Sequence, residues 1–390
     1  MIQTGLEKFI KNFPVELKSK RIGVLCHAAS ITSDYINIID CFKSLPCTLS
    51  AIFGPQHGIF GQTQDNMVEW EGFIHPCLGI PVYSLYGKNR KPDSGMLSGI
   101  DALVIDLQDV GARPYTYIWT IKLCMEACCE KGISVWILDR PNPIGAIPFD
   151  GPMLNKNHFS FVGGASIPLC HRLTLGEMAT LLKNSFFSSL ELNVIWMDGW
   201  KRSSFFSETG LPWVLPSPNM PTPDTAVVYP GMVLLEATNL SEGRGTTRPF
   251  EIFGAPYIKT GEVLAILKLL HLPGCIFREH GFIPTFQKWK GEYCNGFQLH
   301  VTDCRAFLPV YTAVAMLSAV IQTSGDKFQF KQPPYEYETV KMPFDILAGS
   351  DDLRGFIEKH VSLLSIREKW IESHRAFNAI FTKISHYTEN

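Results

Sequence analysis

Three short segments of the chain carry side chains that could do acid–base or binding chemistry. They span residues 54–61, 107–113 and 139–143, and each follows an apolar run, at 49–53, 102–106 and 134–138. Taken singly, each segment is as consistent with an ordinary turn as with a site, because Asp and Gly are common turn residues. Together they favour a site, because ligands of open α/β sheets bind beyond the carboxyl ends of the strands.

The segments contain four side chains that could take part in catalysis or binding. His57 lies in a glycine-rich predicted loop, where an imidazole could donate to a sugar hydroxyl or relay a proton near neutral pH. Asp109 is a better catalytic candidate than Asp106, because Asp106 falls within the predicted strand. Arg113 and Arg140 could clamp a carboxylate or orient an acidic side chain through their forked donors. The alternative for these arginines is a surface ion pair, which contributes little.

A fourth polar segment, residues 236–251, lies in the second half of the chain. Its small residues would let the backbone approach a ligand closely, and its polar side chains offer hydrogen bonds and charge. The candidates are Glu236, Asn239, Glu242, Arg244 and Glu251. No phosphate-binding glycine pattern follows a predicted strand anywhere in the sequence, which argues against nucleotide binding through such a loop.

A parallel sheet is needed to bring the first three segments together. Helices predicted at 6–13, 33–42, 116–131 and 174–186 alternate with strands predicted at 21–25, 49–53, 102–106, 134–138 and 193–197. This repeated β-α-β order is typical of a Rossmann-like, doubly wound α/β sheet with helices on both faces.

The second half of the chain predicts a smaller α+β lobe. Residues 211–231 contain too many prolines for regular structure and form either a linker or a stiff wall of the site. Helices are predicted at 262–270, 308–321 and 351–383, with a strand at 296–301. We therefore expect a catalytic domain at 1–210 and an accessory domain at 211–390 that closes a cleft.

Composition excludes several classes of partner. The 390 residues are 46% hydrophobic and 18% charged, as in a globular protein with a large core. A net charge of -2 without a long basic run argues against nucleic acid. The amino terminus lacks a signal-peptide layout and no apolar stretch would span a bilayer, so we expect a cytoplasmic protein without a membrane partner. Eleven scattered cysteines indicate reduced thiols, and their spacing predicts no metal site and no cofactor.

Six motifs, in this order, resemble the exo-β-N-acetylmuramidases of NamZ type, glycoside hydrolase family 171. They are Gly-Pro-Gln-His-Gly (54–58), Pro-Val-Tyr-Ser-Leu-Tyr-Gly (81–87), Asp-Leu-Gln-Asp-Val-Gly-Ala-Arg (106–113), Leu-Asp-Arg-Pro-Asn-Pro (138–143), Pro-Ser-Pro-Asn-Met-Pro (216–221) and Thr-Asn-Leu-Ser-Glu-Gly-Arg-Gly-Thr (238–246). The resemblance runs from about residue 23 to beyond residue 302.

The resemblance implies a Rossmann-like lobe, an accessory lobe and a cleft that removes terminal N-acetylmuramic acid from peptidoglycan fragments. The lactyl carboxylate of this small carbohydrate would give Arg113, Arg140 or Arg244 a role. Substrate-binding candidates are Gln56, Arg113, Tyr115, Asp139, Arg140, Asn142, Asn219, Glu236, Asn239 and Arg244.

The chain departs from the family pattern at one position. Studied members have Glu in Pro-Glu-His-Gly, a candidate catalytic carboxylate, whereas this chain has Gln56. An amide cannot protonate a leaving oxygen, so the acid and base must come from elsewhere. We expect Asp109 with Glu242 as the carboxylates and Glu251 in reserve, while His57 and Asn239 hold hydroxyls.

Two alternatives to a hydrolase follow from the same residues. Gln56 is consistent with a sugar-binding protein that retains the cleft but lacks a working acid. The Rossmann-like lobe is consistent with a transferase that uses a nucleotide or another activated sugar.

Overall fold

Short apolar runs in the first half of the chain form a seven-stranded sheet. The computed structural model describes residues 2–65 and 67–389. The strands of this sheet are β1 (Arg21–Cys26), β2 (Thr48–Gly54), β3 (Phe73–Ile74), β4 (Pro81–Ser84), β5 (Ala102–Asp106), β6 (Ser134–Leu138) and β9 (Leu192–Ile195). Their order is β3-β4-β2-β1-β5-β6-β9, and all pairs are parallel except β3 with β4.

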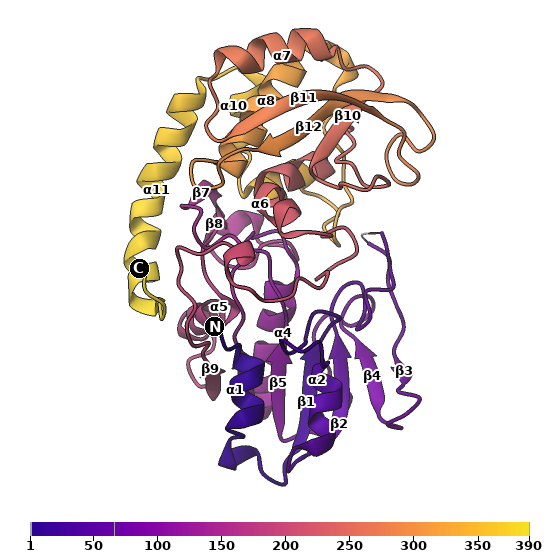
Figure 1. The fold of residues 1–390 in the computed structure, drawn as a ribbon, viewed down its shortest axis with the longest axis vertical. Helices are drawn as coiled ribbons and strands as arrows, with labels where there is room; N and C mark the ends of the chain where they lie inside the picture. Colours follow the sequence, from indigo (N-terminus) through magenta and orange to yellow (C-terminus); the bar gives the residue numbers. More distant parts are fainter. Residues whose placement is uncertain (1, 66, 390) are drawn as a thin grey trace.

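Helices cover both faces of this sheet because its central strands are apolar on both sides. Leu103 and Ile105 share a core with α4 and α5, while Ala102 and Val104 share a core with α1 and α2. The helices of this lobe are α1 (Gly5–Lys11), α2 (Ile38–Cys41), α3 (Ser94–Leu97), α4 (Tyr117–Lys131) and α5 (Leu175–Phe186). The predicted α/β class with a doubly wound sheet is confirmed (Figure 1).

The second lobe is built on a small antiparallel sheet. Its strands are β10 (Ile252–Ala255), β11 (Cys275–Phe282) and β12 (Cys294–Val301), in the order β10-β12-β11. Phe253, Phe277 and Phe297 pack together on one face. The helices are α6 (Pro223–Met232), α7 (Thr260–Leu269), α8 (Pro309–Ser324), α9 (Pro343–Ala348), α10 (Asp352–Glu358) and α11 (Leu363–Ile384). The smaller α+β lobe is thus present, above the first lobe in Figure 1.

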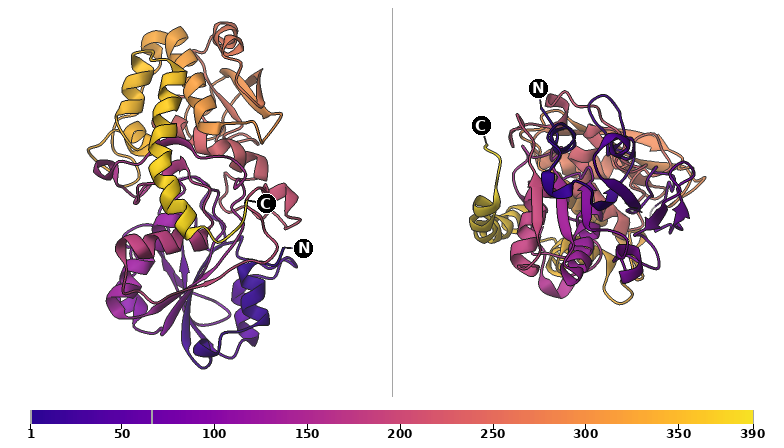
Figure 2. Two further views of the ribbon diagram at one scale, coloured as in Figure 1. Left: turned by 90° about the vertical axis from the view of Figure 1, so that its left-hand side faces the viewer. Right: turned by 90° about the horizontal axis from the view of Figure 1, so that it is seen from below.

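Apart from the segment where the chain passes from the first lobe to the second, two further parts of the structure connect the lobes. The pair β7 (Asp150–Met153) and β8 (Pro168–Cys170) projects from the first half of the chain, and Asp150 Oδ2 accepts from the Val310 N–H at the start of α8, at 2.7 Å. Helix α11 runs along the side of both lobes (Figure 2) and packs against β7 and α5. The domain boundary at 210/211 stays a prediction.

Two predicted helices differ from the structure, and two strands of the second lobe were not predicted. Of residues 33–42, only 38–41 form an α-helix, because Asn37 caps the amide of Ile39 and Tyr35 takes a left-handed φ of 63°. The predicted helix 351–383 is two helices, separated where His360 has a φ of 52°. The β10 and β11 strands were not predicted, since neither shows a clear period of two.

The proline-rich segment 211–231 is not wholly irregular, which corrects that prediction. Its end forms α6, where Thr222 caps the amide of Thr225 and Pro223 occupies the first helical position. A proline is tolerated there because its missing N–H would have had no helical partner. Pro230 also lies inside α6, whose buried side packs against α8.

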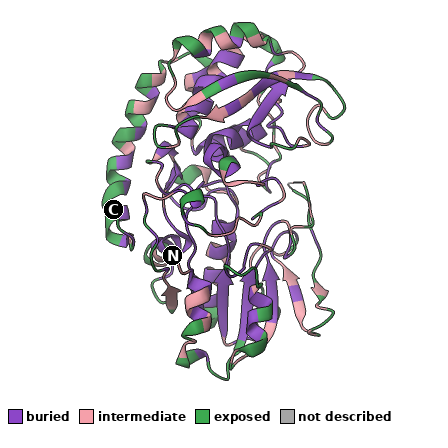
Figure 3. Ribbon diagram, viewed as in Figure 1, coloured by how far each residue is buried: buried purple, intermediate pink, exposed green. Residues whose placement is uncertain are grey.

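Short 3-10 turns complete the chain. Burial is greatest in the central strands of the seven-stranded sheet and in α6 and α8 (Figure 3). The turns are η1 (Val15–Leu17), η2 (Phe42–Ser44), η3 (Lys156–His158), η4 (Phe206–Glu208), η5 (Val233–Ala237) and η6 (Gly325–Lys327). Within the part of the chain that the structure describes, no helix is both long and apolar enough to cross a membrane.

Candidate active site

A cleft of about 490 Å³ opens where the carboxyl ends of β2 and β5 face the second lobe. Its lining combines the start of α4, the proline-rich segment, and two stretches of the second lobe around η5 and residue 336. The lining residues are Gln56, His57, Pro114, Tyr115, Thr116, Tyr117, Val162, Ser217, Asn219, Met220, Tyr229, Glu236, Arg244, Phe250, Tyr335 and Glu336. Carboxyl, amide and aromatic groups therefore converge in one cavity, as in sites for polar small molecules.

Gln56 is a buried side chain at the exit of β2, and two hydrogen bonds fix its amide. Thr116 Oγ1 donates to Gln56 Oε1 at 2.6 Å. Gln56 Nε2 donates to Glu336 Oε1 at 3.3 Å. The amide therefore links the first lobe to a carboxyl group of the second lobe.

Glu336 carries the carboxyl group with the most perturbed acidity in the cleft. Its side chain is 4% exposed, and Tyr86 donates to its Oε2 at 2.9 Å. Burial raises the pKa of Glu336 to about 7, with repulsion from Glu236 acting in the same direction against the hydrogen bonds. A substantial fraction of this carboxyl is therefore protonated at neutral pH. Glu336 also has a left-handed φ of 45°, a strained backbone of the kind that collects at functional sites.

Glu236 provides a second carboxyl group, which is paired with a cation. Arg244 Nη2 donates to Glu236 Oε1 at 2.7 Å, and Tyr335 donates to Oε2 at 2.6 Å. Arg244 in turn contacts Glu242 Oε1 at 2.7 Å, and Lys288 contacts the other oxygen of Glu242 at 2.8 Å. These buried charges form a chain of alternating sign that fixes Glu236 at the wall of the cleft.

Aromatic rings form one side of the cleft. Tyr115 contacts Tyr117 and Tyr229 edge to face, with ring centres 4.7 and 5.8 Å apart. The Tyr117 hydroxyl donates to the Pro216 carbonyl at 2.5 Å and so holds the proline-rich segment against the first lobe. Of the two readings of that segment, a stiff wall describes it here, because Ser217 and Asn219 lie beside the same cavity.

His57 also lines the cleft, with its ring held by its own loop. Its Nδ1 lies 2.7 Å from the carbonyl oxygen of Thr63. Burial lowers the pKa of His57 to about 4, so the imidazole is neutral at pH 7. A neutral ring suits hydrogen bonding to hydroxyls better than transfer of a proton to a leaving group.

Five candidates from the first lobe do not line the cleft, and their side chains bind the backbone or other buried side chains. Asp109 Oδ2 accepts from the Gly111 N–H at 2.7 Å and shapes its own turn. Arg113 is fully buried and donates to four backbone carbonyls. Asp139 accepts from Gly176 and Tyr387, Arg140 pairs with Asp106, and Asn142 bonds to the Leu173 carbonyl.

Three candidates from the second lobe also do not line the cleft. Glu242 lies behind Arg244, and Lys288 and Arg244 overcome the effect of burial and lower its pKa to about 2. Asn239 bonds to the Lys327 carbonyl and accepts from Tyr257. Glu251 pairs with Arg248 and borders a separate cavity. The structure thus gathers Gln56, His57, Tyr115, Asn219, Glu236 and Arg244 of the predicted set.

Sequence models of one family match both halves of the chain. The model for the amino-terminal part of exo-β-N-acetylmuramidase NamZ matches residues 22–224, and the model for its carboxyl-terminal part matches residues 227–387. The chain belongs to the NamZ family. The resemblance seen in the six motifs is confirmed by these matches.

Relatives of this NamZ-family chain cover nearly its whole length. The peptidoglycan β-N-acetylmuramidase NamZ of Bacillus subtilis (strain 168) is 42% identical over 378 residues, 97% of this chain and 89% of that protein. Two crystal structures of DUF1343 family proteins from Bacteroides fragilis NCTC 9343 have a similar fold. One has a TM-score of 0.88 at 32% identity over 99% of both chains, and the other 0.79 at 28% identity over 100% of both.

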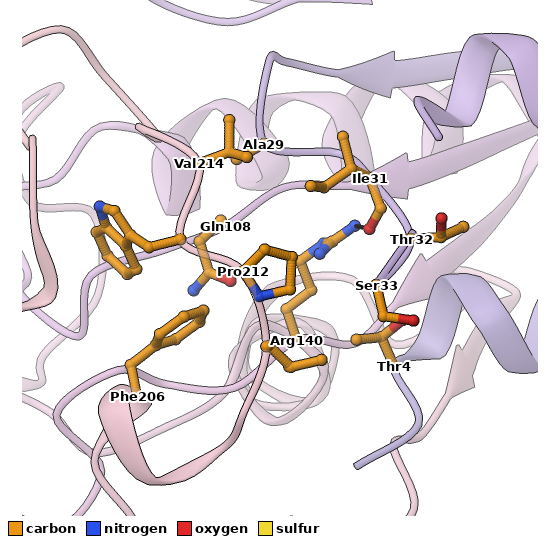
Figure 4. A pocket seen from close by; sticks show the side chains of 12 residues that line it. Thr4, Ala29, Ile31, Thr32, Ser33, Gln108, Arg140, Phe206, Pro212 and Val214 are labelled. Atoms are coloured by element: carbon orange, nitrogen blue, oxygen red, sulfur yellow. Dashed lines mark hydrogen bonds between the residues drawn. The ribbon is translucent and has the colours of Figure 1, made fainter. Parts of the chain in front are cut away.

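The crevice where many doubly wound sheets bind nucleotides holds a smaller cavity in this NamZ-family chain. It lies at the ends of β1 and β5, the strands between which the winding direction reverses. Gln108, Arg140 and the segment 211–214 line a cavity of about 340 Å³ there (Figure 4), against about 490 Å³ for the cleft. The cleft with Glu336 shares none of these lining residues.

Sequence reasoning missed Glu336 and Tyr335 of the cleft. Both lie in the run Pro-Pro-Tyr-Glu-Tyr-Glu at 333–338, which follows no predicted strand. The available signal was acidic and aromatic residues directly after two prolines, a composition like that of the other site segments.

Proposed function

We propose that this protein is a glycoside hydrolase that releases terminal, non-reducing N-acetylmuramic acid from peptidoglycan fragments. Membership of the NamZ family and the 42% identity to the Bacillus subtilis enzyme support this assignment. Within the molecule, the assignment rests on a pair of carboxyl groups in one cleft between the lobes, those of Glu336 and Glu236.

The two carboxyl groups have the different environments that glycoside hydrolysis needs. Glu336, with its pKa raised to about 7, acts as the general acid and gives its proton to the oxygen of the breaking glycosidic bond. Glu236, beside Arg244, is the second carboxylate and acts at the anomeric carbon. One bond from carbon to oxygen breaks, water supplies the new hydroxyl, and Glu336 regains its proton over the cycle.

Gln56 would position the acid in this proposal. Its Nε2 donates to one oxygen of Glu336 and Tyr86 donates to the other. The amide therefore orients the acid. Although position 56 is Gln rather than Glu, the cleft still contains an acid, Glu336. His57 and Asn219 line the same cavity and offer hydrogen bonds to sugar hydroxyls.

Arg244 is the best placed of the three arginines expected to meet the lactyl carboxylate. It lines the cleft, whereas Arg113 and Arg140 are buried elsewhere.

We also place the reaction in the cytoplasm. The cysteines are all free, including the neighbours Cys128 and Cys129, as expected for a reducing compartment.

Hydrolysis of a chromogenic N-acetylmuramide tests the proposal directly. Glu336→Gln removes the proton donor, and we expect kcat/KM to fall by about a hundredfold or more on a disaccharide whose leaving sugar alkoxide needs that proton, the usual contribution of a general acid. The loss should be smaller on the chromogenic substrate, because its phenolate leaves without protonation. Glu262→Gln is the matched control, because Glu262 is exposed on α7 and pairs with the exposed Lys259. Wild-type protein that binds the sugar without turnover at any pH would instead identify a binding protein.

A further inference from the structure

The proposed acid lies in a tight turn, residues 335–338, whose backbone conformation is unusual for its side chains. The Tyr335 N–H donates to the Glu338 carbonyl at 2.8 Å, and the Glu338 N–H donates to the Tyr335 carbonyl at 2.9 Å. Both central residues are left-handed, with a φ of 45° for Glu336 and 68° for Tyr337. These are the features of a type I′ turn, whose central positions favour Asn and Gly. We call residues 335–338 the acid turn.

Contacts from the first half of the chain hold Tyr337 in this conformation. Strain of this kind persists only where the surroundings fix the residue. The Arg90 guanidinium lies 3.9 Å from the centre of the Tyr337 ring. Phe161 and Tyr86 contact the same ring edge to face, with ring centres 5.8 and 5.6 Å away, and the Tyr337 hydroxyl donates to Glu69 at 3.4 Å. The ring is therefore the part of the acid turn that these residues hold.

The position of the Tyr337 ring also fixes the carboxyl group beside it. Glu336 and Tyr337 share one planar peptide unit, so a fixed ring limits how far the Glu336 backbone can rotate. Tyr86 contacts both residues, because its ring packs on Tyr337 and its hydroxyl donates to Glu336 Oε2 at 2.9 Å. Neither Arg90 nor Tyr337 lines the cleft. An effect of these two residues on the acid would therefore pass through the acid turn.

Different charged groups face the carboxyl group and the ring. Glu236 and Arg244 face the carboxyl group from the second lobe. Arg90 and Glu69 face the Tyr337 ring. The other titratable groups near the carboxyl are the hydroxyls of Tyr86, Tyr229 and Tyr335. Burial raises the pKa of all three hydroxyls, so they are neutral at pH 7 and the charge near the acid comes from the second lobe.

Resting on the proposed function, we propose that Tyr337 and Arg90 are positioning residues for the acid. Arg90 holds the Tyr337 ring, and the ring holds the acid turn in the conformation that places Glu336 in the cleft. A glycine at position 337 would adopt this conformation freely, but it would give the first lobe no side chain to hold. The second lobe thus carries the acid, and contacts with the first lobe orient it.

Tyr337→Gly separates the ring from the backbone of the acid turn. Glycine favours the left-handed conformation, so the turn itself should still form. On the disaccharide whose leaving group needs a proton, we expect kcat to fall by about tenfold or more, because the acid loses its orientation. Arg90→Gln should lower kcat in the same direction. Tyr337→Phe keeps the ring and should restore most of the rate.

Infrared titration of the Glu336 carboxyl group gives a second readout, without turnover. The carboxyl band is obtained by subtracting the spectrum of the same protein with Glu336→Gln. In the wild type this band should disappear as the pH rises through about 7. In Tyr337→Gly and Arg90→Gln the carboxyl becomes more accessible to water, which lowers its pKa, so the midpoint should fall by about one pH unit. A general loss of stability would not move this midpoint.

Tyr35→Gly is the matched control, because Tyr35 is 68% exposed and also has a left-handed φ, of 63°. It should keep the kcat and the infrared midpoint of the wild type. A wild-type midpoint or a wild-type kcat in both Tyr337→Gly and Arg90→Gln would overturn the inference, and a wild-type midpoint in one of them would remove that residue from it. The proposed function is judged separately, by turnover in the wild type and its loss in Glu336→Gln.

Discussion

At the scale of single residues, the cleft is defined by a carboxyl group and the amide beside it. Glu336 is buried, and its pKa is raised to about 7. Gln56 contributes a hydrogen bond to it without adding charge. A carboxyl group at position 56 would lie next to Glu336, and two neighbouring carboxyl groups do not both ionise readily.

Gln56→Glu should shift the pH dependence of activity. In the wild type the acid is protonated below its pKa, so kcat/KM should fall as the pH rises through about 7. The new carboxyl would share a proton with Glu336, so the upper pKa of the pair should rise by about one unit or more. The alkaline limb of the pH–rate profile should therefore move to higher pH.

The matched control for this shift is Gln62→Glu, which adds the same charge on the same loop at an exposed position. Its profile should stay with the wild type. An alkaline limb that does not move in Gln56→Glu would show that Glu336 is not the group that titrates.

At the scale of elements, the carboxyl-terminal tail after α11 is fastened to the exit of β6. Tyr387 donates to Asp139 Oδ2 at 2.6 Å and accepts from the Met197 N–H at 2.9 Å. Asp139 also accepts from the Gly176 N–H at the start of α5. One buried carboxyl therefore joins a strand, a helix and the tail.

Tyr387→Phe should destabilise the protein without altering the cleft. The change leaves a buried carboxyl and a buried N–H each short of one partner, which costs about 1–3 kcal/mol of the free energy of unfolding. Urea unfolding measures the loss. Tyr293→Phe is the control, because Tyr293 is 60% exposed, and a loss no larger than in this control would contradict the fastening role of Tyr387.

At the scale of the whole molecule, Arg113 joins the two lobes. Its guanidinium donates to the Pro152 and Ile167 carbonyls and to the Leu347 and Ala348 carbonyls at the end of α9. Burial lowers its pKa to about 9, yet the group remains charged at pH 7. The carbonyls at a helix carboxyl end carry partial negative charge, which suits this cation.

Arg113→Met should lower the stability of the two-lobed protein by about 3 kcal/mol or more, since it leaves several buried carbonyls without donors. The midpoint of urea unfolding reports the effect. Arg305→Met provides the comparison, because Arg305 makes an exposed pair with Glu208 and its loss should cost little. Equal midpoints for the two variants would show that Arg113 does not hold the lobes together.

The sequence by itself determined the α/β class, the family and the strand ends that carry polar residues. Strands such as 102–106 and 134–138 are read from short apolar runs, and local capping predicts the start of α5 at Thr174. These features depend on residues close in sequence, where periodicity and capping act.

Only the tertiary structure decided which polar residues face the cleft. Asp109 and Glu336 are both acidic residues in loops, but one shapes a turn and the other meets Gln56 across 280 positions. Burial and the charge of distant neighbours set the pKa of a carboxyl group, and neither is encoded in the adjacent sequence. The acid that we propose, Glu336, could therefore be identified only from the tertiary structure.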